Sequence, residues 1–177
     1  MKKLGLLLWV LLACESPQAR KPLNAEKSSF IQSSIDRNKK INAAQEQRIK
    51  SVIAQDNNKV YQNNPSGFWY AFLKKTDKRT LPVQGDEVKF SYKIATLEGE
   101  ILYDEMELGE VNYLVDKEDL IAALRLGVKV LSEGEVATFL FPSHLCYGYQ
   151  GDGDKIGINQ PLRYTLQLNS HKKQNQK

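Results

Sequence analysis

The chain has 177 residues, of which 41% are hydrophobic and 26% are charged, and its formal net charge is +4 at pH 7. This composition supports a packed core and excludes a chain that is disordered throughout. The length suits one domain of ordinary size with an appendage. The mild positive charge gives no reason to expect a nucleic-acid partner.

The first residues have the pattern of a bacterial lipoprotein signal. A basic start (MKK) precedes an apolar run over residues 4–10, and the letters LLAC at residues 11–14 resemble a lipobox. The apolar run is too short to span a membrane. We therefore expect a signal peptide over residues 1–13, lipidation of Cys14, and a flexible tether over residues 14–24. A plain secretory signal, in which Cys14 is incidental, is the alternative.

Lipidation of Cys14 would determine the compartment in which the protein is located. Two or more acyl chains hold a protein stably on a membrane, so Cys14 predicts an anchor in the bacterial cell envelope, at the outer membrane and facing the periplasm. Loss of the two signal lysines would reduce the net charge to +2. Cys146 would then be the only free thiol, which excludes a disulfide within the chain. We interpret Cys146 as a small buried apolar residue.

Residues 25–66 are predicted to form an N-terminal helical segment. A helix over residues 25–56 is favoured by Lys, Gln, Glu and Arg and by apolar residues at steps of three and four. A loop rich in Asn follows. Packing against its own domain, a stalk, and a dimer formed through the helix are three interpretations that stay open. The apolar residues are Phe30, Ile31, Ile35, Ile41, Ala44, Ile49, Val52 and Ile53.

Strand patterns fill the expected domain at residues 67–170, and a polar tail is expected at residues 171–177. A short helix is expected near residues 120–131, with Asp116 as its N-terminal cap. The sequence predicts an α+β fold, in which an antiparallel sheet of five or six strands wraps over one short helix and a separate N-terminal helix precedes it. The expected strands are residues 67–74, 88–94, 101–104, 111–115, 137–141 and 162–168. In the last one, strict alternation places four residues on one face, namely Leu162, Tyr164, Leu166 and Leu168.

No constellation of ligands predicts a metal or a cofactor. The two histidines and two cysteines do not form a cluster with zinc spacing. Asp152-Gly153-Asp154 resembles a fragment of a calcium loop whose remaining ligands are missing, and we interpret it as a solvated turn. Ser143 and His144 are adjacent, which does not make a catalytic triad.

Residues 136–168 combine a strand, a tight turn, a glycine-bearing loop with Tyr147 and Ile156, and a second strand. This suits the wall and flap of an apolar pocket. With the motifs Leu120-Ile121, Gly127 and Gly134-Glu135 upstream, the segment over residues 81–168 resembles the FKBP-type peptidyl-prolyl cis/trans isomerases. The order of the N-terminal helix, the Asn-rich loop and the sheet behind a lipobox is most similar to the gliding-motility-associated FKBP-type lipoproteins of Bacteroidetes.

The resemblance implies a set of site residues. Those with an expected catalytic role are Tyr92, Asp104, Tyr147 and Ile156. Those expected to line the substrate pocket are Tyr103, Val111, Leu120, Ile121, Leu124 and Tyr164. Three positions depart from the family pattern: Leu124 replaces a floor tryptophan, Val111 a wall phenylalanine, and Gly157-Ile158 two flap prolines. We expect a deeper floor that grips a proline ring less closely.

The resemblance also implies the reaction. An X-Pro bond isomerises slowly because twisting the amide costs resonance, a barrier of roughly 20 kcal/mol. A catalyst needs no nucleophile or metal, but must bind the twisted amide better than the planar one. We expect an isomerase that acts on proline-containing polypeptides, in exported or envelope proteins. The alternatives are a non-catalytic binding module or chaperone of the same fold, and a scaffold that uses the N-terminal helix.

Overall fold

The computed structural model describes residues 25–77 and 79–174. The expected signal peptide over residues 1–13, Cys14 and the tether over residues 14–24 lie outside the described residues. The chain divides into two units, Met1–Asp36 and Arg37–Lys177. Every strand belongs to the second unit. Within the described part of the chain, no helix combines the length and apolar character needed to cross a membrane.

The long helix α1 (Ala25–Gln55) begins in the first unit and ends in the second. In the first unit its apolar residues Phe30, Ile31 and Ile35 are exposed. In the second unit Ile49 is buried and packs against Leu97 and Leu140, in a small apolar cluster of its own. The part of α1 from Arg37 onward is thus packed on its own domain, which is the first of the three interpretations.

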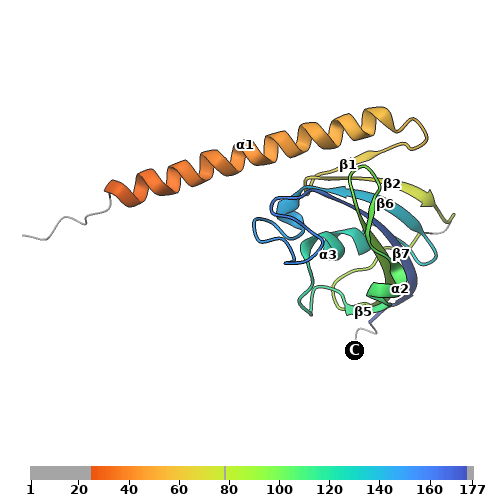
Figure 1. The fold of residues 1–177 in the computed structure, drawn as a ribbon. Helices are drawn as coiled ribbons and strands as arrows, with labels where there is room; N and C mark the ends of the chain where they lie inside the picture. Colours follow the sequence, from red (N-terminus) through yellow and green to blue (C-terminus); the bar gives the residue numbers. More distant parts are fainter. Residues whose placement is uncertain (1–24, 78, 175–177) are drawn as a thin grey trace, which may run out of the picture. The chain divides into compact units, whose positions relative to one another are not determined.

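The second unit contains a seven-stranded antiparallel sheet in the order β1-β2-β6-β7-β3-β4, with β5 also paired to β3 (Figure 1). This confirms the predicted α+β class and adds a strand, because part of the predicted Asn-rich loop pairs with β2. The strands are β1 (Gln62–Asn64), β2 (Phe68–Lys74), β3 (Glu87–Thr96), β4 (Ile101–Tyr103), β5 (Val111–Leu114), β6 (Val136–Phe141) and β7 (Leu162–Lys172).

The sheet curves around the short helix α3 (Ala122–Val128) and buries the main core between them (Figure 1). The four alternating residues predicted on one face of β7 are all buried there. Gly127 allows the close approach, because a Cβ at this position would lie 3.0 Å from Leu166 Cδ2. Helix α3 is therefore held directly against β7.

One local prediction was wrong, and one short helix was not predicted. Asp116 does not cap α3: the helix begins after Ile121 without a side-chain cap, and Asp116 has a φ of 53° and pairs with Lys129 at 3.0 Å. A short helix α2 (Glu105–Leu108), which the sequence pattern does not reveal, follows β4 and is capped by Asp104. A side-chain contact thus caps α2, whereas α3 starts without one.

The sheet extends beyond the predicted range of residues 67–170 at both ends. Strand β1 joins it at the N-terminal side because it pairs with β2, and β7 continues to Lys172. At this end His171 Nε2 lies 2.7 Å from Asp86 Oδ2, and both side chains are buried. This contact holds the start of the predicted polar tail in the sheet.

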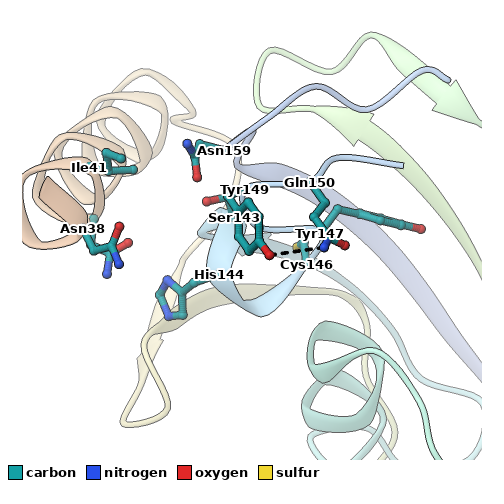
Figure 2. Close-up of a pocket in the computed structure, with 11 residues that line it drawn as sticks. Asn38, Ile41, Ser143, His144, Cys146, Tyr147, Tyr149, Gln150 and Asn159 are labelled. Carbon is teal, nitrogen blue, oxygen red and sulfur yellow. Dashed lines mark hydrogen bonds between the residues drawn. The ribbon is translucent and has the colours of Figure 1, made fainter. Parts of the chain in front are cut away.

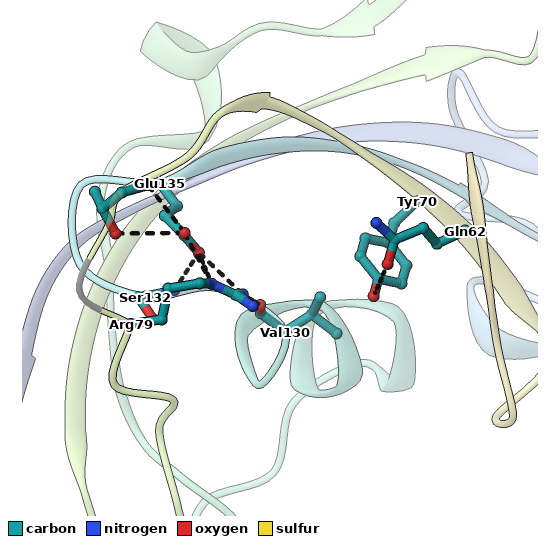
Figure 3. A network of polar contacts seen from close by, with 7 residues as sticks. Gln62, Tyr70, Arg79, Val130, Ser132 and Glu135 are labelled. Carbon is teal, nitrogen blue, oxygen red and sulfur yellow. Dashed lines mark hydrogen bonds and ion pairs between the residues drawn. The ribbon is translucent and has the colours of Figure 1, made fainter. Parts of the chain in front are cut away.

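A buried carboxylate closes the turn between α3 and β6 (Figure 3). Glu135 accepts hydrogen bonds from the backbone N–H of Ser132 (2.9 Å) and of Thr76 (3.1 Å), and from Arg79 Nε (2.9 Å). Arg79 also donates to the carbonyl of Val130. Burial alone raises the pKa of the Glu135 carboxyl, but the hydrogen bonds from Arg79 and the two N–H groups outweigh it, and the pKa is lowered.

We predict that Glu135→Ala destabilises the domain by about 3 kcal/mol, because it leaves a guanidinium and a buried N–H unpaired. Since its pKa is lower in the folded chain, the contribution of Glu135 is present above about pH 4.5 and is lost as the pH falls through the folded value. Urea unfolding at neutral and acidic pH measures both effects. The matched control is Glu100→Ala, at an exposed carboxylate; equal losses in the two variants would contradict the prediction.

Candidate functional site

Nine of the ten predicted site residues lie in one apolar cluster, either buried in it or packed against it. They come from β3, β4, β5, the start of α3, the loop after β6, and β7. The nine residues are Tyr92, Tyr103, Val111, Leu120, Ile121, Leu124, Tyr147, Ile156 and Tyr164. The curved sheet therefore brings together residues that are up to 72 positions apart in the sequence.

A shallow, wide-open cavity of about 430 Å³ lies at the start of α3. Tyr92, Leu120, Ile121 and Leu124 line it, together with Asp119 at its rim. Among the lining residues Leu124 is only 3% exposed. The Ile121 carbonyl accepts the first hydrogen bonds of α3, while its N–H has no hydrogen-bond acceptor among the described residues. This N–H is available to a ligand in the cavity.

Tyrosines form the sheet wall beside this cavity. The rings of Tyr92 and Tyr164 are stacked, with centroids 6.2 Å apart, and Tyr164 meets Phe141 edge to face at 5.5 Å. Burial raises the pKa of Tyr92, and burial followed by the nearby Tyr92 and Asp152 raises that of Tyr147. Both hydroxyls are therefore protonated at neutral pH and can donate a hydrogen bond.

The Cys146 thiol next to Tyr147 is not a reactive group. Its burial raises its pKa to about 12, so the thiol stays protonated at neutral pH. The fully buried Tyr164 hydroxyl has no hydrogen-bond partner of good geometry among the described residues. Burial, followed by the nearby Cys146 and Tyr147, raises its pKa as well. The part of the site around Cys146 and Tyr164 therefore carries no charge at neutral pH.

The flap is organised by Asp152, which the sequence interpretation treated as part of a solvated turn. Its Oδ1 accepts from the backbone N–H of Asp154 (2.9 Å) and of Ile156 (2.8 Å), and its Oδ2 accepts from the Tyr103 hydroxyl. The bond to Asp152 raises the pKa of Tyr103 to about 12. That interpretation holds for the exposed Gly153 and Asp154 but not for Asp152, which is only partly exposed and whose carboxylate bonds the flap to β4, next to the buried Ile156. An Asp followed by Gly, which commonly bonds its own backbone two residues on, was the available signal.

Asp104 is the one predicted site residue outside the cluster. Its exposed carboxylate accepts from the backbone N–H of Glu107 at 2.8 Å and caps α2. Lys155 of the flap lies over the ring of Tyr103, 4.4 Å from its centroid, and pairs with Glu107 at 2.7 Å. Asp104 thus helps to place α2 beside the flap, and its catalytic role stays a prediction.

A second cavity of about 430 Å³ lies between α1 and the loop after β6 (Figure 2). Tyr147 lines this cavity and also packs against the apolar cluster, so this residue borders both. Asn38, Ile41 and Asn42 of α1 line the opposite side. Among the described residues, no group of three His, Cys, Asp or Glu side chains could hold a metal ion.

We predict that Asp152→Ala loosens the flap and lowers stability by about 1 kcal/mol, because two backbone N–H groups and a phenol lose their acceptor. Hydrogen exchange at the N–H groups of Asp154 and Ile156 should become faster. The matched control is Asp154→Ala, which removes an exposed carboxylate from the same loop and leaves both bonds to Asp152 in place. Unchanged exchange in Asp152→Ala would show that the flap is held by other contacts.

Known proteins share this sequence and this fold. The sequence profile of the FKBP-type peptidyl-prolyl cis-trans isomerases matches residues 78–169. A probable FKBP-type peptidyl-prolyl cis-trans isomerase, FkpA of Neisseria meningitidis serogroup B, is 31% identical over 120 residues, which cover 68% of this chain and 42% of that protein. Human peptidyl-prolyl cis-trans isomerase FKBP9 is 30% identical over 96 residues, which cover 54% of this chain and 17% of that protein.

The chain therefore spans less than half of the length of these relatives. The crystal structure of FkpA from Escherichia coli has a TM-score of 0.59 at 22% identity, covers 85% of this chain and 70% of its own, and shows the same fold. The profile match extends over half of the sequence and includes all ten predicted site residues. The chain belongs to the family of FKBP-type peptidyl-prolyl cis-trans isomerases.

Proposed function

We propose that this protein catalyses the cis/trans isomerisation of X-Pro bonds in polypeptides. The observation that carries the proposal is the gathering of nine predicted site residues in one cluster, four of which line a cavity at the start of α3, in a chain of this family. Its lining is of mixed polarity, and its apolar side chains Leu120, Ile121 and Leu124 offer contacts to a proline ring. No residue is required to act as a nucleophile or base, because the reaction breaks no bond.

The geometry supports a mechanism in which the site binds the twisted amide of the transition state more tightly than the planar amide. A proline ring held over Leu124 leaves its amide near the Ile121 N–H and the tyrosine wall. The Tyr147 hydroxyl would then donate to the carbonyl as it turns out of the amide plane. An interaction that is stronger with the twisted amide than with either planar form lowers the barrier, and exclusion of water strengthens it.

A non-catalytic binding module is the second candidate, and the base of the cavity favours it. Leu124 is smaller than the tryptophan usual in the family, and Val111 is smaller than the usual phenylalanine. Tyr113 is buried in the same cluster, but its hydroxyl is held by the backbone N–H of Asp116 at 3.0 Å. A site of this kind would bind proline-containing segments loosely, without selecting the twisted amide.

We predict that protein beginning after Cys14 accelerates isomerisation of a short Xaa-Pro peptide in a protease-coupled assay. Tyr147→Phe should lower kcat/KM about tenfold, since it removes one hydrogen bond made in the transition state. Tyr149→Phe is the matched control: the same change, two residues away, at a side chain that is 74% exposed. Asp104→Asn, measured beside them, keeps the cap and removes the charge, and so tests whether Asp104 takes part.

Folded wild-type protein that gives no acceleration would overturn the isomerase and favour the binding module. Full activity in Tyr147→Phe would keep the isomerase but remove Tyr147 from its mechanism. Circular dichroism of each variant establishes that the fold is intact before the rates are compared.

We further propose that the protein is a lipoprotein of the bacterial envelope, which acts on exported or envelope proteins. The lipobox pattern that ends at Cys14 supports this proposal.

A role in gliding motility is supported only by the resemblance to the Bacteroidetes lipoproteins, and loss of colony spreading on deletion of the gene would test it. A dimer through α1 is supported by the exposed Phe30, Ile31 and Ile35, and sedimentation at several concentrations would test it.

We predict that the chain incorporates labelled palmitate when it is expressed in a bacterium that processes lipoproteins, and that Cys14→Ser abolishes the label, because the acyl chains are attached at this residue. Cys146→Ser is the matched control and should keep the label, since that thiol lies inside the domain. Label that persists in Cys14→Ser would contradict the lipoprotein proposal and support a plain secretory signal.

A further inference from the structure

One buried polar side chain connects α1 to the loop that carries Tyr147. Gln45 is only 7% exposed and lies outside the residues matched by the family profile. Its Oε1 accepts from the backbone N–H of Ser143 (2.8 Å), and its Nε2 donates to Ser143 Oγ (2.9 Å) and to the carbonyl of Asn159 (2.9 Å). The amide group of Gln45 thus has its hydrogen bonds at both ends of one loop.

The two partners of Gln45 mark the start and the end of the segment that carries Tyr147 and Ile156. Inside that segment the carbonyl of Ser143 accepts from the N–H of Gly148 at 2.8 Å. The carbonyl of Gly148 accepts in turn from the N–H of Asn159 at 2.7 Å. A continuous path of hydrogen bonds therefore runs from Gln45 to the backbone beside Tyr147.

The apolar contacts of α1 and the amide of Gln45 bind different parts of the domain. Ile49, one helical turn after Gln45, packs against Leu97 and Leu140 and attaches the helix to the sheet. That contact does not touch the loop. A buried amide is costly unless its hydrogen bonds are made, and those of Gln45 are all made to the loop. Its geometry fits the ordering of the loop better than the attachment of the helix.

We propose that Gln45 is a positioning residue of the site: it joins the two ends of the loop over residues 143–159 and so sets the places of Tyr147 and Ile156. This inference rests on the proposed isomerase function. It makes the C-terminal part of α1 a component of the site, although α1 precedes the region that defines the family. It also differs from the scaffold alternative, in which the helix does not affect isomerisation.

The test compares Gln45→Met with Gln47→Met in protein that begins after Cys14. Methionine keeps the length and flexibility of the side chain and removes its hydrogen bonds, and Gln47 is an exposed residue of the same helix. A misplacement of about 1 Å can cost about 100-fold in rate, so we expect kcat/KM to fall about tenfold in Gln45→Met, with a larger change in kcat than in KM. Gln47→Met should keep the wild-type values.

Hydrogen exchange gives a readout that does not depend on activity. The N–H groups of Gly148 and Asn159 should exchange faster in Gln45→Met, while those of β6 and β7 keep their rates. Ser143→Ala is a second, milder variant, because it removes only the bond to Ser143 Oγ and leaves the bond to the Ser143 N–H. Since both changes act on one contact, the double variant should lose no more activity than Gln45→Met alone.

The outcomes separate this inference from the proposed function. Wild-type rates and wild-type exchange in a folded Gln45→Met would overturn the inference and leave the isomerase in place. An inactive wild type overturns the isomerase, and the exchange rates then decide whether Gln45 orders the loop. If Gln45→Met does not fold, Ser143→Ala replaces it, and unchanged exchange at Gly148 and Asn159 in that variant overturns the inference.

Discussion

The close packing of α3 against β7 sets the geometry of everything around it. Gly127 brings the helix so near to Leu166 that an added Cβ would lie 3.0 Å from Leu166 Cδ2, so the Leu166 side chain or the helix would have to shift to accept it. The start of the helix, at Leu120 and Ile121, then faces the tyrosine wall across the cavity. A shift of the helix by the width of a methyl group would change the size of this cavity. The contact at Gly127 therefore matters to the site, although it lies outside it.

Apolar burial places the strands and α3, but three buried or partly buried polar side chains place the loops. Glu135, Asp152 and Gln45 each accept a hydrogen bond from at least one backbone N–H at a loop or turn. Apolar contacts have little directional preference and tolerate small shifts, whereas an unpaired N–H in the interior is costly. Polar contacts of this kind thus fix the loops to one conformation. The apolar core supplies most of the stability, and these three side chains supply the local order.

The sequence predicted what depends on periodicity and on an ordered motif. Alternation predicted the buried face of β7, and the family resemblance predicted nine residues that the fold brings together. The failures have another origin. Asp116 was assigned as a cap from its spacing alone, but its carboxylate bonds Lys129 instead. Gln45 bonds residues that are 98 and 114 positions away. A single polar contact at that separation leaves no periodic pattern, so only the folded chain reveals it.

The departures at Leu124 and Val111 change the shape of the pocket. The nature of the reaction limits the effect of such a change on the rate. Isomerisation needs no bond to be broken, so its rate depends on where hydrogen-bond donors stand relative to the twisted amide. On the proposed isomerase mechanism, a smaller floor would lower the affinity for every form of the substrate alike, which affects KM more than kcat. In the binding-module alternative, it would also remove the selection of the twisted amide. A misplaced donor affects only the transition state. On the proposed mechanism, the loop that carries Tyr147, with its bonds to Gln45, would therefore affect catalysis more than the floor beneath the ring.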